Sequence, residues 1–157
     1  MKRTTIAKTF AIAAVTALAL GMAPTAKADD KGCSNATLKG TFAYTMTGFV
    51  LIPALAGPFA EVGTQTFDGK GATTAAATLS QNGNIDQVTI TGKYTVNPDC
   101  TGTFTLQVSP FGITNRVFFV IHDGGTGFQG IETNPAPGGV ITSVGRKQFP
   151  AVADWRE

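Results

Sequence analysis

The chain has 157 residues, with 12 Lys or Arg against 10 Asp or Glu and only two cysteines. Its formal charge of +2 and the lack of any cluster of basic residues exclude the electrostatic footprint of a nucleic-acid-binding protein, so we expect no nucleic-acid partner. The length suits one domain with a hydrophobic core of its own.

The first 28 residues have the pattern of a secretory signal peptide. A basic start over residues 2–8 precedes an apolar run, 10–22, that is too short to span a bilayer, and Ala-Lys-Ala at 26–28 matches a cleavage site. Four of the 12 basic residues lie in this segment, so the remaining chain has eight against ten acids and a formal charge of −2. We expect a secreted or periplasmic protein with a single domain over residues 29–157.

The remaining chain shows the pattern of an all-β protein. Short runs rich in Thr, Val, Phe and Gly are bounded by turn residues, which predicts eight strands over residues 37–49, 59–67, 72–80, 86–96, 101–108, 115–121, 128–133 and 140–147. Most connections have hairpin length. We predict an eight-stranded antiparallel up-and-down barrel of the calycin-like kind, because closure removes exposed strand edges. A β-sandwich is the alternative, and the lack of a Trp between the cysteines weighs against it.

The two faces of the strands differ in polarity. Residues 86–96 alternate Val, Ile and Tyr with Thr, Gln and Lys, which indicates one buried and one wet face. A Thr-rich outer face lacks the apolar residues that lipid contact requires, so we expect no membrane insertion of the mature chain. The run 117–121 is apolar without alternation, and residues 149–155 are the candidate segment to cover its outer face.

The cysteines, Cys33 and Cys100, are predicted to form a disulfide, since an even pair in an oxidising compartment is usually a structural bridge. Two separate buried thiols are the alternative. In a meander the connections alternate between the two ends of the barrel. Cys33 just before the first strand and Cys100 just before the fifth therefore share one end, as a bridge requires.

The connections at the other end are expected to be longer and more apolar. Apolar side chains stand where solvated loops are usually polar, at Leu51, Ile52, Leu55, Phe111 and Ile113. They would form a lid or portal over a ligand cavity, or fold inward and plug the barrel, and the sequence leaves both open.

Two carboxylates, Glu61 and Glu132, fall on the inward face near this end by strand parity, and Arg116 is placed to pair with either. An inward carboxylate in an apolar cavity is a candidate for a perturbed pKa and for ligand anchoring, with a solvated strand end as the alternative. Tyr44 and Tyr94 are expected inward and deeper. The candidate ligand-binding residues are Tyr44, Leu55, Phe59, Glu61, Phe111, Arg116 and Glu132.

No motif assigns a catalytic residue, a metal site or a cofactor. The single histidine, His122, excludes a multi-histidine metal site, and no Gly-x-Ser-x-Gly elbow is present. Residues 68–71 and 122–125 are interpreted as hairpin turns rather than calcium loops, because they lack the full ligand spacing.

Three segments carry a family resemblance. Residues 33–42 (CSNATLKGTF), 66–71 (TFDGKG) and 92–103 (GKYTVNPDCTGT) resemble a group of small exported bacterial proteins of unknown function, which implies no activity. The outline is also similar to lipocalin and calycin barrels, whose corresponding first loop partly closes a ligand mouth, although Gly-Thr-Phe at 40–42 replaces their Gly-x-Trp. Barrels of the allene oxide cyclase type are similar in outline, without a matching catalytic motif.

These observations favour a barrel that binds a small, largely apolar ligand. One alternative is an isomerase or cyclase in which an inward carboxylate beside a tyrosine moves a proton. Another is an envelope-interaction or structural protein with a filled barrel. The identity of a ligand, enzymatic activity and the oligomeric state do not follow from the sequence.

Overall fold

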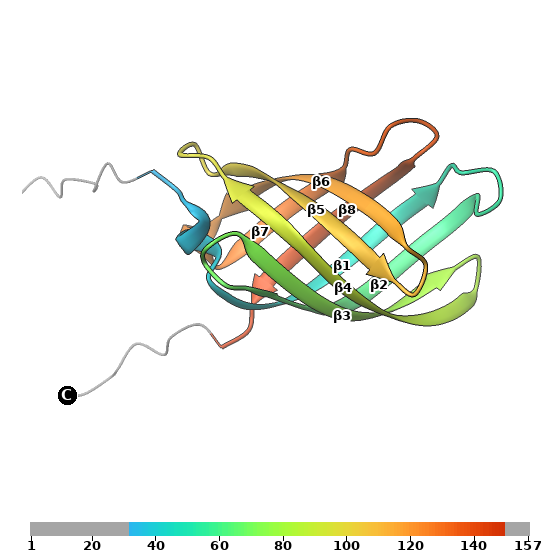
Figure 1. The fold of residues 1–157 in the computed structure, drawn as a ribbon, viewed down its shortest axis with the longest axis horizontal. Coiled ribbons are helices and arrows are strands. Elements are labelled where there is room, and N and C mark those ends of the chain that lie inside the picture. Colours follow the sequence, from blue (N-terminus) through green and yellow to red (C-terminus); the bar gives the residue numbers. More distant parts are fainter. Residues whose placement is uncertain (1–31, 150–157) are drawn as a thin grey trace, which may run out of the picture. The chain divides into compact units, whose positions relative to one another are not determined.

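Each strand pairs with its sequence neighbour in antiparallel orientation, and the first strand also pairs with the last, so the sheet closes into a barrel (Figure 1). The computed structural model describes residues 32–149. The strands are β1 (Gly40–Val50), β2 (Gly57–Phe67), β3 (Ala72–Gln81), β4 (Asn84–Val96), β5 (Thr101–Ser109), β6 (Ile113–His122), β7 (Gly127–Glu132) and β8 (Gly139–Lys147). The predicted signal peptide lies outside the described residues.

The predicted eight-stranded meander is confirmed, and the sandwich alternative is excluded by the pairing of β1 with β8. The first strand begins later than predicted. Residues 37–39 were expected to open it, but Asn35–Leu38 form a short 3-10 helix, η1. Tertiary contacts explain the difference, because Asn35 Oδ1 accepts a hydrogen bond from the Val96 amide at 2.8 Å and the Tyr94 hydroxyl donates to the Asn35 carbonyl at 3.0 Å.

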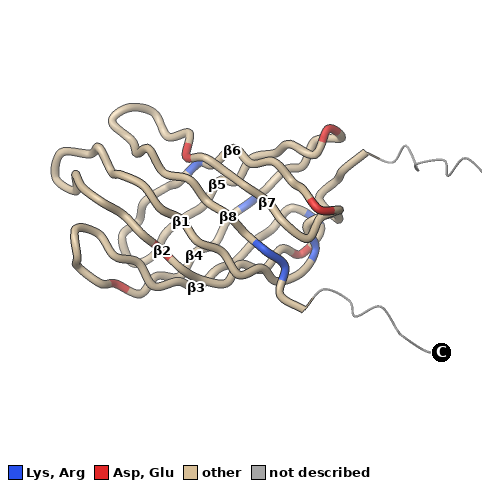
Figure 2. Tube along the Cα trace, turned by 180° about the vertical axis from the view of Figure 1, so that it is seen from behind, with Lys and Arg blue, Asp and Glu red and all other residues tan. Residues whose placement is uncertain are grey.

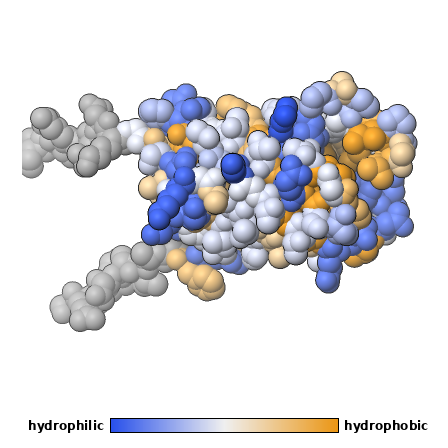
Figure 3. Space-filling view, viewed as in Figure 1, coloured by the Kyte–Doolittle hydropathy of each residue, from blue (hydrophilic) through white to orange (hydrophobic). Residues whose placement is uncertain are grey.

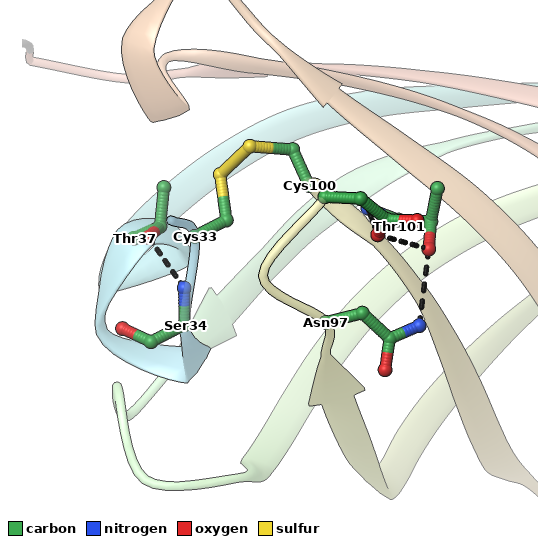
Figure 4. The surroundings of a disulfide bond; sticks show 7 residues. Cys33, Ser34, Thr37, Asn97, Cys100 and Thr101 are labelled. Carbon is green, nitrogen blue, oxygen red and sulfur yellow. Dashed lines mark hydrogen bonds between the residues drawn. A yellow bond between two sulfur atoms is a disulfide. The ribbon is translucent and has the colours of Figure 1, made fainter. Parts of the chain in front are cut away.

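One end of the barrel, called the turn end here, holds the β2–β3, β4–β5 and β6–β7 turns together with η1. The predicted disulfide between Cys33 and Cys100 is present at this end, with the Cα atoms 4.9 Å apart (Figure 4). The Cys33 amide also donates to the Pro98 carbonyl at 3.0 Å. The segment before β1 is therefore attached to the β4–β5 turn by both a covalent bond and a hydrogen bond.

Five buried phenylalanines fill the half of the barrel nearer the turn end, and we call them the phenylalanine floor: Phe42, Phe67, Phe104, Phe119 and Phe128. Neighbouring ring centroids lie between 4.1 and 6.4 Å apart, in stacked and edge-to-face contacts. Inward glycines make room for these rings. A Cβ atom on Gly102 would lie 2.3 Å from the Phe119 ring, and one on Gly145 would lie 2.2 Å from the Phe128 ring.

The outer face is rich in exposed threonine but carries apolar side chains over β6, β7 and β8. As predicted, β6 carries apolar side chains on both of its faces, since Val117 and Phe119 are buried while Phe118 and Val120 are exposed. Phe149, the described start of the segment expected to cover this face, is 90 % exposed, and residues 150–155 lie outside the described range. Within residues 32–149, no helix is both long and apolar enough to cross a membrane.

Candidate ligand-binding site

The end opposite the turn end, called the mouth, contains a cavity of about 630 Å³ between the loops and the phenylalanine floor. This volume lies in the range of small-molecule sites. Nine apolar side chains line it: Val50, Ile52, Leu55, Phe59, Leu79, Val108, Phe111, Ile113 and Ile141. Apolar surface gathers toward the mouth, at the right of Figure 3.

The apolar loop residues form a rim and do not plug this half of the barrel. Leu51, Ile52, Leu55, Phe111 and Ile113 remain at least one-third exposed. The filled half is the turn end, where the phenylalanine floor takes the place of a plug. These apolar loop residues therefore surround an open space at the mouth, and do not fill the barrel.

The mouth loops are shorter than expected on one side. The β3–β4 connection is the two-residue hairpin Asn82–Gly83, with φ values of 52° and 84°, which suits the tight turns that follow the twist of paired strands. The expectation of long connections holds for residues 51–56 and 133–138. It is wrong for this hairpin and for the β5–β6 connection, which has only the three residues 110–112. Gln81 and Asn82 side chains donate to the carbonyls of Leu55 and Ala56 at 2.7 and 2.8 Å, and so hold the first loop against the hairpin.

Glu61 on β2 lies at the base of the mouth cavity and is only 5 % exposed. The Tyr44 hydroxyl on β1 donates a hydrogen bond of 2.5 Å to Glu61 Oε1. Burial raises the pKa of Glu61, and the hydrogen bond from Tyr44 partly offsets this rise. Burial and the neighbouring Glu61 charge both raise the pKa of Tyr44, so this hydroxyl keeps its proton and acts as the donor.

A second, smaller cavity of about 30 Å³ lies directly below and shares Glu61, Val108 and Asn115 with the first. Ser143 on β8 also lines it, and its buried Oγ has no hydrogen-bond partner among the described residues. The strand register places Ser143 opposite Met46, and Met46 opposite Glu61, so Ser143 and Glu61 belong to one row across β8, β1 and β2. Both side chains are inward members of that row.

Glu132 at the end of β7 is the second inward carboxylate and is half-buried at the rim. Asn134 donates to Glu132 Oε1 at 3.0 Å and to Asn115 Oδ1 at 2.9 Å, which fixes the orientation of the carboxylate. Burial raises the pKa of Glu132, and the Asn134 hydrogen bond opposes that rise. Asn134 Oδ1 also accepts from the Arg116 amide at 2.8 Å, so one amide side chain joins β6 to the β7–β8 loop.

The structure brings together five of the seven candidate residues around the mouth cavity, namely Leu55, Phe59, Glu61, Phe111 and Glu132. Tyr44 lines the small cavity below and not the mouth cavity. Arg116 is a correction. Because Val117 and Phe119 face the core, Arg116 faces outward, is exposed and makes no ion pair with Glu61 or Glu132.

Sequence reasoning missed seven polar lining residues: Gln65, Gln81, Asn84, Asp86, Asn115, Asn134 and Ser143. The signal for Asp86 was available, because it shares the inward parity of Val88 and Ile90 on β4. The inward position of Ser143 follows in the same way from Ile141 on β8. The role of Asn134 comes from its hydrogen bonds across a loop, for which the sequence carries no pattern.

His122 lies at the turn end, far along β6 from the mouth, and its Nδ1 contacts Asp123 Oδ2 at 2.8 Å. No group of three His, Cys, Asp or Glu residues within residues 32–149 is arranged to hold a metal ion.

Solved β-barrels match this fold at low sequence identity. A redesigned β-barrel, b11L5F_LGL, aligns with a TM-score of 0.52 and 19 % identity over 73 % of this chain and 94 % of that chain. EF1p2_mFAP2b, solved bound to DFHBI, aligns with a TM-score of 0.54 and 16 % identity over 76 % of this chain and 98 % of its own. No protein-family model and no curated protein matches the chain. The comparisons thus establish a closed antiparallel β-barrel and no family, and the resemblance to exported bacterial proteins stays an expectation.

Proposed function

We propose that this protein binds a small, largely apolar ligand non-covalently in the mouth cavity. The observation that carries the proposal is the space of about 630 Å³, lined mainly by apolar side chains, above a tightly filled floor. A barrel of similar fold, EF1p2_mFAP2b, was solved with DFHBI bound, which also supports the proposal. We further propose that the protein acts outside the cytoplasm, on the basis of the signal-peptide pattern and the disulfide.

A titration with the neutral dye Nile red tests the proposal. We expect saturable fluorescence enhancement at one dye per protein. Val108→Trp places an indole in the cavity, since Val108 lines both spaces, and should abolish this enhancement. The matched control, Val62→Trp, makes the same change on the exposed face of β2 and should leave dye binding intact. No enhancement with the wild type, or equal enhancement with both variants, would overturn the proposal.

A second candidate function is proton transfer by Glu61, as in an isomerase or cyclase. The observation that favours it is the inward Glu61 carboxyl group, buried in an apolar site and held by the Tyr44 hydroxyl at 2.5 Å. A carboxylate with a raised pKa in such a site is suited to act as a general base.

Nitrobenzisoxazole tests this second candidate, because its ring opens when a base removes one carbon-bound proton. We expect ring opening faster than with acetate at equal concentration, lost in Glu61→Gln and kept in Glu132→Gln. A rate that does not depend on Glu61 removes the candidate and leaves ligand binding untouched.

A further inference from the structure

The charged groups that line the mouth cavity are all acidic. Glu61, Asp86 and Glu132 reach it from β2, β4 and β7. None of the described residues that line it is Lys, Arg or His. Most described Lys and Arg residues lie toward the turn end, at the right of Figure 2, and Arg116 faces outward from β6. The cavity is therefore apolar in its walls and negative in its charge.

Two polar groups at the base of the cavity have unused hydrogen-bonding capacity. Tyr44 is the one hydrogen-bond donor to the Glu61 carboxyl group among residues 32–149, and it uses Oε1, which leaves Oε2. Ser143 Oγ, on a residue only 6 % exposed, has no partner in the same part of the chain. A buried hydroxyl without a partner is uncommon in folded proteins. Both groups line the small cavity, which shares Glu61, Val108 and Asn115 with the mouth cavity.

On the basis of the ligand-binding function proposed above, we propose that the mouth cavity selects an apolar amine. Its protonated nitrogen would contact Glu61 Oε2 and Ser143 Oγ, and its apolar part would extend to Leu55 and Phe111 at the rim. An ammonium group donates hydrogen bonds and carries the complementary charge. A ligand that ends in a carboxylate would bring a like charge into a site of low dielectric constant, which is unfavourable.

The proposal implies a definite pH dependence. Burial raises the pKa of Glu61 in the free protein, and a bound ammonium would lower it again, because the positive charge favours the ionised carboxylate. Amine binding should therefore release a proton and strengthen as pH rises through the pKa of free Glu61. The titratable groups that share its surroundings are Tyr44 from β1, Asp86 from β4 and Glu132 from β7, and none of them is cationic.

Three probes with the same chain separate the end group from the apolar part: decylamine, decan-1-ol and decanoate. Each is titrated by calorimetry into the oxidised protein at neutral pH, with decylamine and decanoate below their micelle concentrations and decan-1-ol below its solubility limit. We expect decylamine to bind at least roughly tenfold more tightly than decanoate, with decan-1-ol between them. The double variant Glu61→Gln with Glu132→Gln should remove the preference for decylamine over decan-1-ol and decanoate. Asp123→Asn, which removes one negative charge at the turn end, is the net-charge control for the single variant Glu61→Gln, which is titrated as well.

The outcomes distinguish the two proposals. If none of the three probes binds and Nile red does not bind, the ligand-binding function fails. If decan-1-ol and decanoate bind as tightly as decylamine, the function stands and the selection of an amine is refuted. If the double variant does not fold, Glu132→Gln and Glu61→Gln are tested singly, and an unchanged preference in both folded variants also refutes it. If Glu61→Gln loses no more of the preference than Asp123→Asn does, the effect is one of long-range charge, which likewise overturns the assigned contact.

Discussion

Replacing both Cys33 and Cys100 by serine should weaken the fold without altering the mouth. The two residues are 67 positions apart in the chain, so the disulfide closes a long loop in the unfolded state. In the chain-entropy model a loop of this length stabilises the folded protein by about 4 kcal/mol. For a domain of this size that loss corresponds to a fall in melting temperature of roughly 10–20 °C.

The folded state has non-covalent reasons to keep its shape once the bond is gone. In the variant, the Asn35 side chain still accepts a hydrogen bond from the Val96 amide, and the Asn35 carbonyl still accepts one from the Tyr94 hydroxyl. The backbone amide at position 33 still donates to the Pro98 carbonyl. Most of the change should therefore arise in the unfolded chain, as greater conformational freedom.

Urea and thermal unfolding of the double variant and the oxidised wild type measure the effect. Wild type treated with reductant is the matched control and should unfold with the variant. Nile red affinity should stay within about twofold of wild type, because the disulfide lies at the opposite end from the cavity. A loss below about 1 kcal/mol would refute the entropic reasoning. Loss of dye binding by a folded double variant would show that the ligand site depends on the turn end.

Three further predictions concern the interior. Phe128→Ala removes a ring that contacts the other four members of the phenylalanine floor and should cost about 3–5 kcal/mol in urea unfolding; a cost below 1 kcal/mol would mean that the floor is loosely filled. Gly102→Ala places a methyl group 2.3 Å from the Thr95 carbonyl oxygen as well as the Phe119 ring, and should destabilise by at least about 1–3 kcal/mol, whereas a neutral result would contradict the close contact. Glu61 has a raised pKa in the folded state, so its contribution is fully present below its unfolded pKa of about 4.3 and is lost as pH rises through the folded value. Glu61→Gln should therefore be more stable than wild type at neutral pH and lose that advantage in acid, which thermal melts across pH will measure. A variant that is less stable than wild type at neutral pH would contradict this prediction.

The strand order and the turn end could be predicted because both depend on local patterns. Alternation in β4 and the turn residues between strands gave eight strands and a meander, and the meander placed Cys33 beside Cys100. Strand parity also gave the inward positions of Glu61 and Glu132. These inferences needed only the two-residue period of a strand and the alternation of hairpin ends.

Other features depended on contacts across the barrel and were beyond a local pattern. Residues 37–38 of η1 were interpreted as strand because the stabilising partners of this short helix, Val96 and Tyr94, are about sixty residues away. Arg116 was expected to pair with Glu61 or Glu132 because β6 is apolar on both faces, so its sequence pattern does not show which residues point inward. The cavity exists because the five rings of the phenylalanine floor fill only part of the interior. How much volume the rings fill depends on their packing in three dimensions, which a strand pattern does not show.

The phenylalanine floor has a kinetic consequence, because it leaves the mouth as the one way in and out of the cavity within the described barrel. A ligand that reaches Glu61 must pass the rim in both directions. A substitution at Leu51, a rim residue outside the cavity lining, that narrows the passage without touching the bound ligand would slow association and dissociation by the same factor. Residence time and affinity could then be varied separately, the first through the rim and the second through the base of the cavity.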